Sequence, residues 1–444
     1  MRNSFLFYKN LKGALFMTVK YSKETIAVKG GYTPGNGEPA VLPIYQCATY
    51  KYDDPDFLQR LFDLKEEGHL YSRISNPTVA AFEEKYAQLE GGVGAVATSS
   101  GQSAILLSIL NICKAGDNLI SVSSLYGGTI NLFTVNLKKL GIDVTFVDPE
   151  ATKEEILSVA NEKTKLIYGE TIGNPGLNVL DFEKFVSVAN ELKVPLVVDN
   201  TVATPHHCNP IELGANVVVH STTKYSEGHG QTIGGIIVDG GNFDWQSGKF
   251  NDLVLPDESY HGVKYVDDFG KAAYIVKLRV TLMRDLGVPM TPFNAYLTNL
   301  GLETLSLRMD KHSQNALDVA KWLENNDKIA WVNYPYLESN LKYNRSLKYL
   351  NGGASGLLTF GIKGGLEDAK EFTKQLELVN LVITLGDTRT CILHPASTTH
   401  NQLSDEEKIA SGVAPDMLRL SVGIENVNDI INDLDNALNK TFNK

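Results

Sequence analysis

A lysine ends the stretch Val217-Val218-Val219-His220-Ser221-Thr222-Thr223-Lys224, in which an apolar segment runs into a series of hydroxyl side chains. A second apolar segment, Pro195-Leu196-Val197-Val198, ends on Asp199 in a similar way. Short runs of β-branched residues favour buried strands. The sequence therefore predicts two strands of one sheet, with an acid at the end of the first and a lysine just beyond the end of the second.

This pairing of an acid and a lysine is suited to the chemistry of pyridoxal phosphate. Lys224 can form a Schiff base with the aldehyde. Asp199 can pair with the pyridinium nitrogen and so keep the ring an electron sink. The hydroxyl groups of Ser221 and Thr223 can donate hydrogen bonds to the phosphate. We therefore expect pyridoxal 5'-phosphate as the cofactor.

The region around these residues shows the alternation of an α/β fold. The expected strands are Ala95–Thr98, Leu119–Val122, Val144–Val147, Leu166–Tyr168, Leu196–Val198, Val217–Val219 and Gly234–Val238. The expected helices between them include Gln102–Ile112, Thr129–Leu140, Lys153–Ala160 and Phe182–Leu192. This pattern predicts a mostly parallel sheet with helices on both faces. Ligands bind such sheets outside the carboxyl ends of the strands, where Asp199 and Lys224 fall.

The chain divides into three parts. Residues 1–75 are expected to form an N-terminal arm, in which residues 1–16 are an extension or lie ahead of a start at Met17. Residues 76–300 form the expected cofactor-binding domain, with an irregular insertion at about 241–268 and a helical pattern over 268–286. Residues 301–444 form a smaller C-terminal α/β domain, entered through a helical run over 292–326. Its expected elements are strands near Leu357–Ile362, Val382–Leu385 and Met417–Val422 and a closing helix Val427–Leu438.

Composition excludes several classes of protein. The net charge is −11 and no basic stripe is found, so we expect no nucleic-acid partner. No apolar run approaches the roughly 18 residues of a membrane span. The N-terminal residues lack the apolar core and cleavage site of a signal peptide. We expect a cytoplasmic protein without a membrane partner.

Cysteines and histidines give no metal signature. The four cysteines, Cys47, Cys113, Cys208 and Cys391, are scattered and show no C-x-x-C spacing. This argues against structural zinc and against a disulfide framework, and free thiols fit a reducing cytosol. His229 and the segment His394–His400 match no standard ligand spacing, so we expect no metal.

Two further strand ends carry candidate site residues. The segment Thr98-Ser99-Ser100-Gly101-Gln102-Ser103-Ala104 joins a strand to a helix, and its small residues either bring backbone N–H groups to a phosphate or form an ordinary N-cap. Tyr126 opens the next helix, where its ring can stack on a planar cofactor and its phenol can act as an acid or base, or where it simply occupies a turn.

Three more candidates have a structural alternative of their own. Asn174, in Glu170-Thr171-Ile172-Gly173-Asn174-Pro175, either binds the ring hydroxyl of the cofactor or belongs to an Asn-Pro turn. Arg419 lies in an apolar strand and needs a partner, either a substrate carboxylate or a structural ion pair. Arg73, in Tyr71-Ser72-Arg73, has the features of a solvated charge on the arm.

Taken together, these residues resemble the Cys/Met-metabolism family of pyridoxal-phosphate enzymes, over about residues 20–438. The resemblance rests on the order and spacing of Tyr71, Arg73, Gly101, Gln102, Tyr126, Asn174, Asp199, Ser221, Thr223, Lys224 and Arg419. It implies the aspartate-aminotransferase-like fold, fold type I of these enzymes. It also implies that Tyr71 and Arg73 reach the phosphate of a neighbouring subunit's cofactor, so that a dimer is the catalytic minimum and a tetramer is the usual assembly.

Within the family, the resemblance implies a γ-replacement in methionine biosynthesis, in which O-acetyl-L-homoserine and sulfide give L-homocysteine and acetate. The insertion at 241–268, the segments 386–390 and 394–400, and Gly128 carry this subgroup resemblance. Gln102 and Thr384 depart from common family residues, and Thr384 is left without a role. The alternatives are cystathionine γ-synthase or γ-lyase chemistry and, more remotely, a non-catalytic scaffold that binds the cofactor.

Overall fold

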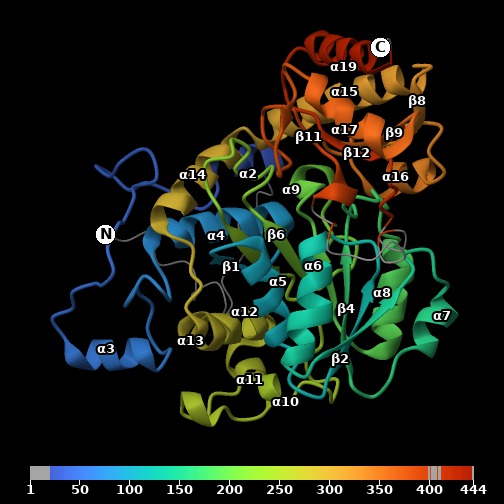
Figure 1. Cartoon of the computed structure of the whole chain (residues 1–444). Helices are drawn as coiled ribbons and strands as arrows, with labels where there is room; N and C mark the ends of the chain where they lie inside the picture. Colours follow the sequence, from blue (N-terminus) through green and yellow to red (C-terminus); the bar gives the residue numbers. More distant parts are fainter. Residues whose placement is uncertain (1–20, 399–400, 402–407, 409–411, 443–444) are drawn as a thin grey trace.

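The computed structural model describes residues 21–398, 401, 408 and 412–442. The expected extension at 1–16 and His400 lie outside the described residues. Two sheets organise the rest of the chain, a larger one in the centre of the molecule and a smaller one near the C-terminus (Figure 1).

The larger sheet has seven strands in the order β1-β7-β6-β5-β4-β2-β3. Its strands are β1 (Gly94–Thr98), β2 (Asn118–Val122), β3 (Asp143–Val147), β4 (Thr164–Glu170), β5 (Leu196–Asp199), β6 (Val217–Ser221) and β7 (Gly235–Asp239). The strands from β3 to β6 pair in parallel, whereas β7 runs antiparallel to both β1 and β6. The mostly parallel sheet expected from the sequence is confirmed. Its register places Glu170, Asp199 and the end of β6 along one edge.

Helices cover this sheet (Figure 1). Contacts to its strands come from α4 (Pro77–Glu90), α5 (Gly101–Leu110), the π-helix η2 (Leu132–Leu137), α8 (Phe182–Leu192) and α12 (Ala273–Leu278). The same region contains the short helices α6 (Gly127–Asn131), α7 (Lys153–Ser158) and α9 (Thr204–His207). Every residue of β1, β2 and β7 is buried, as expected when both faces of a sheet are covered. Local sequence sets the helix starts: Asn76 caps α4 ahead of Pro77, and Ser100 forms a capping box with Ser103 on α5.

The expected irregular insertion is partly helical. Residues 251–286 form α10 (Asn251–Val254), η3 (Glu258–Tyr260), α11 (Tyr265–Phe269), η4 (Gly270–Ala272), α12 (Ala273–Leu278), the π-helix η5 (Arg279–Met283) and α13 (Arg284–Leu286). Gly270 and Gly287, both at positive φ, end α11 and α13. The long helix expected over 268–286 was therefore only partly right, because Gly270 separates α11 from the helical run that follows.

The helical run expected over 292–326 is two helices, α14 (Pro292–Glu303) and α15 (Leu305–Glu324). The break at Thr304 has a physical cause in Arg308. The guanidinium of Arg308 donates to the backbone carbonyl of Gly301 at 2.6 Å, an acceptor that an uninterrupted helix would use itself. A buried arginine thus takes the carbonyl of Gly301 at the point where α14 ends and α15 begins.

The smaller sheet has five strands in the order β10-β11-β12-β9-β8. Its region contains β8 (Ile329–Asn333), α16 (Tyr343–Tyr349), β9 (Leu357–Ile362), α17 (Gly365–Gln375), β10 (Asn380–Leu381), β11 (Cys391–Leu393), η6 (Pro395–Ser397), β12 (Met417–Ser421) and α19 (Val427–Phe442). The strand expected at Val382–Leu385 was wrong. The chain leaves the sheet after Leu381, and the carbonyl of Thr384 accepts from Arg419 instead of from a neighbouring strand.

The arm is less irregular than expected, since it contains α2 (Lys23–Lys29) and α3 (Pro55–Phe62). Helix α2 contacts α4, α14 and α15, which ties the start of the described chain to the body of the molecule. Within the described ranges, no helix combines the length and the apolar character needed to cross a bilayer.

Candidate active site

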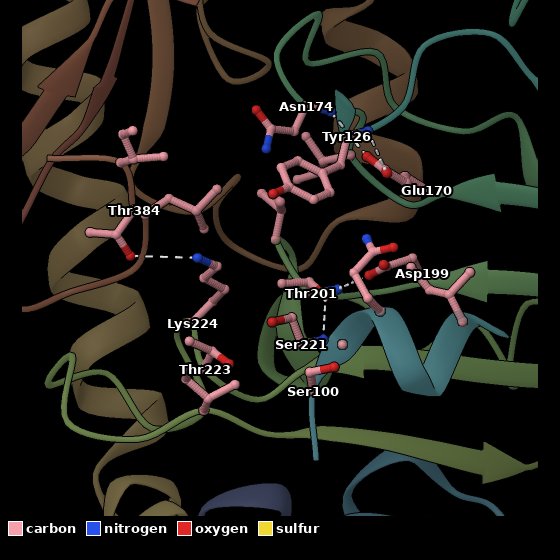
Figure 2. A pocket seen from close by; sticks show the side chains of 18 of the residues that line it. Ser100, Tyr126, Glu170, Asn174, Asp199, Thr201, Ser221, Thr223, Lys224 and Thr384 are labelled. Atoms are coloured by element: carbon pink, nitrogen blue, oxygen red, sulfur yellow. Dashed lines mark hydrogen bonds between the residues drawn. The ribbon is translucent and has the colours of Figure 1, made fainter. Parts of the chain in front are cut away.

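A pocket of about 970 Å³, its open mouth included, lies where the ends of β4, β5 and β6 face the C-terminal region (Figure 2). Nine of the eleven candidate residues line it, namely Gly101, Gln102, Tyr126, Asn174, Asp199, Ser221, Thr223, Lys224 and Arg419. Tyr71 and Arg73 do not. The strand-end rule therefore located most of the candidate site within a single chain.

Lys224 extends across this pocket toward the C-terminal region (Figure 2). Its Nζ lies 3.5 Å from the Oγ1 of Thr384, the departing residue to which the sequence assigned no role. Burial and the nearby Arg419 lower the pKa of Lys224 to about 8. A substantial fraction of the amine is therefore neutral just above neutral pH, the form that attacks an aldehyde or accepts a proton.

Asp199 faces the pocket from the end of β5, on the other side from Lys224 (Figure 2). Its Oδ1 accepts from the backbone N–H of Thr201 at 2.9 Å, and the Thr201 hydroxyl accepts from the backbone N–H of Ser221 at 2.8 Å. Burial raises the pKa of Asp199, and the hydrogen bonds from Thr201 oppose that effect. Sequence reasoning missed Thr201, although a hydroxyl residue two positions after a strand-end acid is a turn signal.

Small side chains bring the start of α5 against the end of β6. A Cβ on Gly101 would lie 2.5 Å from the Cβ of Ser221, so only glycine allows this approach. The first turn of a helix presents backbone N–H groups that suit a phosphate. Thr223 also lines the pocket, but its hydroxyl exchanges hydrogen bonds with the backbone of Gly234, at 3.2 Å to the carbonyl and 3.0 Å from the N–H.

Arg419 is buried on β12, and both of its described partners are uncharged oxygens. Its Nη1 donates to the Oδ1 of Asn174 at 3.0 Å and its Nη2 donates to the carbonyl of Thr384 at 2.8 Å. Within the described residues its Nε has no hydrogen-bond partner, and burial lowers the pKa of the guanidinium. Neither contact is an ion pair, which was the structural alternative for Arg419. The Nε of Arg419 is therefore available as a buried donor to a carboxylate.

Glu170 was quoted in the sequence motif but given no role. It is buried in the pocket wall, where its Oε1 accepts from the backbone N–H of Tyr126 at 2.8 Å and its Oε2 from that of Asn174 at 3.1 Å (Figure 2). Burial and the neighbouring Asp199 raise the pKa of Glu170 well above its usual value. A Cβ on Gly128 would lie 2.5 Å from the Cε1 of Tyr126, so this glycine leaves room for the ring.

Tyr71 and Arg73 lie outside the pocket of their own chain. Both are exposed, and the guanidinium carbon of Arg73 lies 5.2 Å from the centre of the Tyr71 ring. Arg279 holds the turn that follows them, because its Nη1 donates to the carbonyl of Ile74 at 2.9 Å. The single chain therefore presents this pair on its surface.

The described residues contain no group of three or more histidine, cysteine, aspartate or glutamate side chains that could hold a metal ion. His229 contacts the backbone carbonyl of Glu227, and His394 contacts that of Pro415.

Comparison with known proteins decides the family. A model of the Cys/Met metabolism PLP-dependent enzymes matches residues 24–439. The chain belongs to this family. The O-acetyl-L-homoserine sulfhydrylase of Leptospira meyeri is 48% identical, with 95% of this chain and 98% of the relative covered. O-acetyl-L-homoserine sulfhydrylase 1 of Thermus thermophilus is 46% identical over 94% and 99% of the two chains.

Solved structures of PLP-dependent enzymes share the fold. The structure of metY from Campylobacter jejuni, which contains N'-pyridoxyl-lysine-5'-monophosphate, has a TM-score of 0.91 at 36% identity and covers 94% of this chain and 100% of its own. The structure of metB from Corynebacterium glutamicum has a TM-score of 0.82 at 31% identity, with coverage of 95% and 98%. The aspartate-aminotransferase-like architecture of the family is therefore also that of this chain.

The pocket fits the family's cofactor, pyridoxal 5'-phosphate. It combines a partly buried amine on Lys224, a partly buried acid on Asp199 and a glycine at 101, where a Cβ would collide with Ser221. These are the groups that a pyridine aldehyde bearing a phosphate needs.

Proposed function

We propose that this family member catalyses γ-replacement on O-acetyl-L-homoserine with sulfide, giving L-homocysteine and acetate. The observation that carries the proposal is the buried Arg419, whose Nε has no hydrogen-bond partner among the described residues and which lines the same pocket as Lys224. This donor suits the carboxylate of an amino-acid substrate. The curated names of the relatives at 46–48% identity support the same reaction.

When bound, pyridoxal phosphate supplies a ring that accepts electrons from the substrate's Cα–H bond. The protein's residues do the remaining work. Arg419 binds the substrate carboxylate and so orients Cα toward Lys224. The neutral amine of Lys224 removes the Cα proton and returns one at the end of the reaction. Once Lys224 had passed the Cα proton on to the bound cofactor, its amine would take a Cβ proton while the bond between Cγ and the ester oxygen breaks and acetate leaves with the electron pair. Sulfide sulfur would then bond to Cγ, and Lys224 would return protons to Cβ and Cα.

The other site residues bind and orient the cofactor in this proposal. Asp199, oriented by Thr201, holds the proton on the ring nitrogen. The backbone N–H groups of Gly101 and Gln102 and the hydroxyl of Ser221 face the phosphate. For Thr223, which already bonds to Gly234, we propose a role in shaping this end of the pocket as well as the expected phosphate contact.

Tyr126 and Asn174 complete the proposed set. The half-exposed ring of Tyr126 stacks on the cofactor, and its phenol exchanges a proton near the leaving group. Asn174 binds the ring hydroxyl through its amide nitrogen, since its Oδ1 already accepts from Arg419.

The apolar pocket mouth supports an acetyl ester. Ile233 and Ile383 line the pocket with 61% and 69% of their surface exposed. The cations of the pocket lining, Lys224 and Arg419, are assigned to the cofactor and the α-carboxylate. A succinyl or phosphoryl ester would bring a second anion to this mouth without a matching cation from the lining of the same chain. An acetyl group brings none.

We also propose that the protein is a cytoplasmic homo-oligomer whose active sites need two chains. Tyr71 and Arg73 lie on the surface of their own chain, so they are free to reach a neighbour's phosphate, a contact that suits a planar guanidinium. Exposed apolar side chains on neighbouring helices, Val28 of α2, Phe293 and Leu300 of α14 and Leu307 of α15, offer surface for a second copy. A dimer is the proposed catalytic minimum, and a tetramer the expected assembly.

A product assay tests the reaction. The purified holoenzyme is supplied with O-acetyl-, O-succinyl- or O-phosphohomoserine, each with sulfide, methanethiol or cysteine. We expect homocysteine and acetate from the acetyl ester with sulfide at the highest kcat/KM. Cystathionine as the main product, or 2-oxobutyrate and ammonia without a thiol, would replace the proposal with the γ-synthase or γ-lyase alternative. If no combination of ester and thiol gave a product, the non-catalytic scaffold would be the remaining alternative.

A further inference from the structure

Glu170 is a buried acid that the reaction proposed above does not use. It ends β4, has 6% of its surface exposed, and lies beside Asp199, its partner in the register of β4 and β5. Its two oxygens accept the backbone N–H groups of Tyr126 and Asn174. An acid beside another acid is unfavourable in a buried site, so its presence here calls for a compensating role.

Those two N–H groups belong to different loops. Tyr126 follows β2 and begins α6 without a side-chain cap, whereas Asn174 follows β4 itself. Figure 2 shows both bonds converging on the one carboxyl group. Because each oxygen takes one N–H, one carboxyl group joins the two backbones at Tyr126 and Asn174. The loops are also joined farther along, where the Ser124 hydroxyl donates to the Oδ1 of Asn178 at 3.2 Å. A neutral amide has one acceptor oxygen only and would turn an N–H donor toward one of these N–H groups.

Asn174 extends this connection to the substrate site. Its Oδ1 accepts from the Nη1 of Arg419 at 3.0 Å, and the Nη2 of Arg419 donates to the carbonyl of Thr384 at 2.8 Å. Movement of the Asn174 backbone would therefore remove one of the two contacts that fix the guanidinium plane. The direction of the unpaired Nε depends on that plane.

We propose that Glu170 is a positioning residue that fixes the substrate-carboxylate site, by holding the backbones of Tyr126 and Asn174 and, through Asn174, the plane of Arg419. The inference deepens the proposed function and rests on its assignment of Arg419 to the substrate carboxylate. Glu170 touches neither substrate nor reacting atoms in this role.

The test is binding of an unreactive amino acid, L-norvaline, to the holoenzyme, followed by the change in cofactor absorbance. In Glu170→Gln we expect norvaline to bind about tenfold more weakly, the factor for the loss of about one hydrogen bond in a buried site. The weakening should appear in KM for the amino-acid substrate as well, with a smaller change in kcat. Binding within twofold of the wild type would overturn the proposal.

Two further variants separate positioning from charge and from stability. Glu170→Asp keeps the acid but removes one methylene, which draws both oxygens back from the two N–H groups, and we expect weaker norvaline binding again. Wild-type binding in Glu170→Asp would overturn the proposal, and this variant also decides the matter if Glu170→Gln does not fold. Asp239→Asn is the matched control, because Asp239 is buried, accepts the backbone N–H of Gly241 at 2.9 Å and lies beside the start of β6, far from the site end.

We expect Asp239→Asn to bind norvaline within twofold of the wild type even where its melting temperature falls. Equal weakening in Asp239→Asn would mean that loss of any buried acid loosens the site, and would overturn the specific role of Glu170. Norvaline binding does not require turnover, so the proposed reaction can fail in the product assay while this result stands.

Discussion

The pocket at the strand ends and the surface turn at Tyr71–Arg73 differ in how a single chain presents them. Lys224 and Asp199 project into one cavity because parallel strands end along the same edge of a sheet. Arg73 stacks on Tyr71 at the surface and is not among the described residues that line that cavity. The carboxyl ends of parallel strands indicate where the site residues of a single chain lie. They give no indication of residues that would act in the site of a neighbouring chain.

The largest effect on activity is expected from mutation of Lys224, which lies in the pocket. Lys224→Ala should lose the covalent link to the cofactor and lower kcat by at least about 10³-fold. The wild type should be yellow, because the Schiff base absorbs at about 420 nm. Substantial turnover by the variant, or a wild type that stays colourless with added cofactor, would show that Lys224 does not form the Schiff base.

Asp199→Asn should have the next largest effect. The amide is nearly the same size and still binds near Thr201, so the cofactor should bind, but the ring loses its charged partner. We expect kcat to fall by about 10²-fold or more. Deuterium at the substrate Cα should then give a larger isotope effect on kcat, since proton removal becomes limiting. Turnover close to wild type would mean that another acid serves the ring.

Subunit mixing tests the surface side of the comparison. Arg73→Ala should lower activity at limiting cofactor by about tenfold to a hundredfold, the value of a charge-assisted phosphate contact. Mixed with Lys224→Ala under subunit exchange, it should recover up to about a quarter of wild-type activity, since half of the dimers are mixed and each has one intact site.

Exchange itself is checked by native mass spectrometry of differently tagged chains. If mixed dimers form and activity stays at the level of the separate variants, Arg73 is a surface charge and the two-chain site is wrong. Arg73→Lys should recover little, because an ammonium group lacks the planar fork.

A smaller effect is expected in the pH dependence of the rate at which Lys224 captures the cofactor. The neutral amine of Lys224 attacks the aldehyde, and the pKa of Lys224 is lowered to about 8. The rate of capture by the apoprotein should therefore rise about tenfold per pH unit below about pH 8 and level off above it. Stopped-flow absorbance measures this rate. Arg419→Met removes a nearby positive charge, so the pKa of Lys224 should rise and the inflection should move to higher pH.

The smallest effect is expected on the stability of the single chain at the surface turn. Arg73→Ala should change the free energy of unfolding by less than about 1 kcal/mol, because an exposed stacking contact contributes little. Urea denaturation of the variant beside the wild type measures it. A loss of several kcal/mol would show that Arg73 stabilises its own chain, so that the surface turn would no longer differ from the pocket in this respect.

The sequence predicted the parts of the molecule in which local pattern and long-range structure agree. The strands of the central sheet are continuous apolar runs, so their ends, and with them Asp199 and Lys224, could be located in advance. Gly101 could be singled out because small residues between a strand and a helix allow a phosphate to approach the backbone. Its close approach to Ser221 could not be foreseen.

The parts that sequence reasoning missed depend on partners far away in the chain. Glu170 was given no role, because its contacts are two backbone N–H groups on different loops. The break at Thr304 needs the side chain of Arg308. The strand expected at 382–385 does not form because Thr384 bonds to Arg419, and apolar residues that line a pocket have the same local pattern as those of a strand.

The backbone on both sides of Lys224 is anchored, by the bond from Ser221 to Thr201 on one side and by the bond from the Thr388 N–H to the Gly228 carbonyl, at 2.9 Å, on the other. Travel of the amine between the positions at which it takes and releases protons is therefore left to the torsions of its own side chain. Rotations of exposed side chains take picoseconds to nanoseconds, whereas a typical enzyme turns over about ten times per second. The partly exposed side chain of Lys224 can rotate many times more slowly than that and still be fast relative to turnover. The lysine can visit every position along its reach many times within one catalytic cycle, so its movement does not set the pace of the reaction.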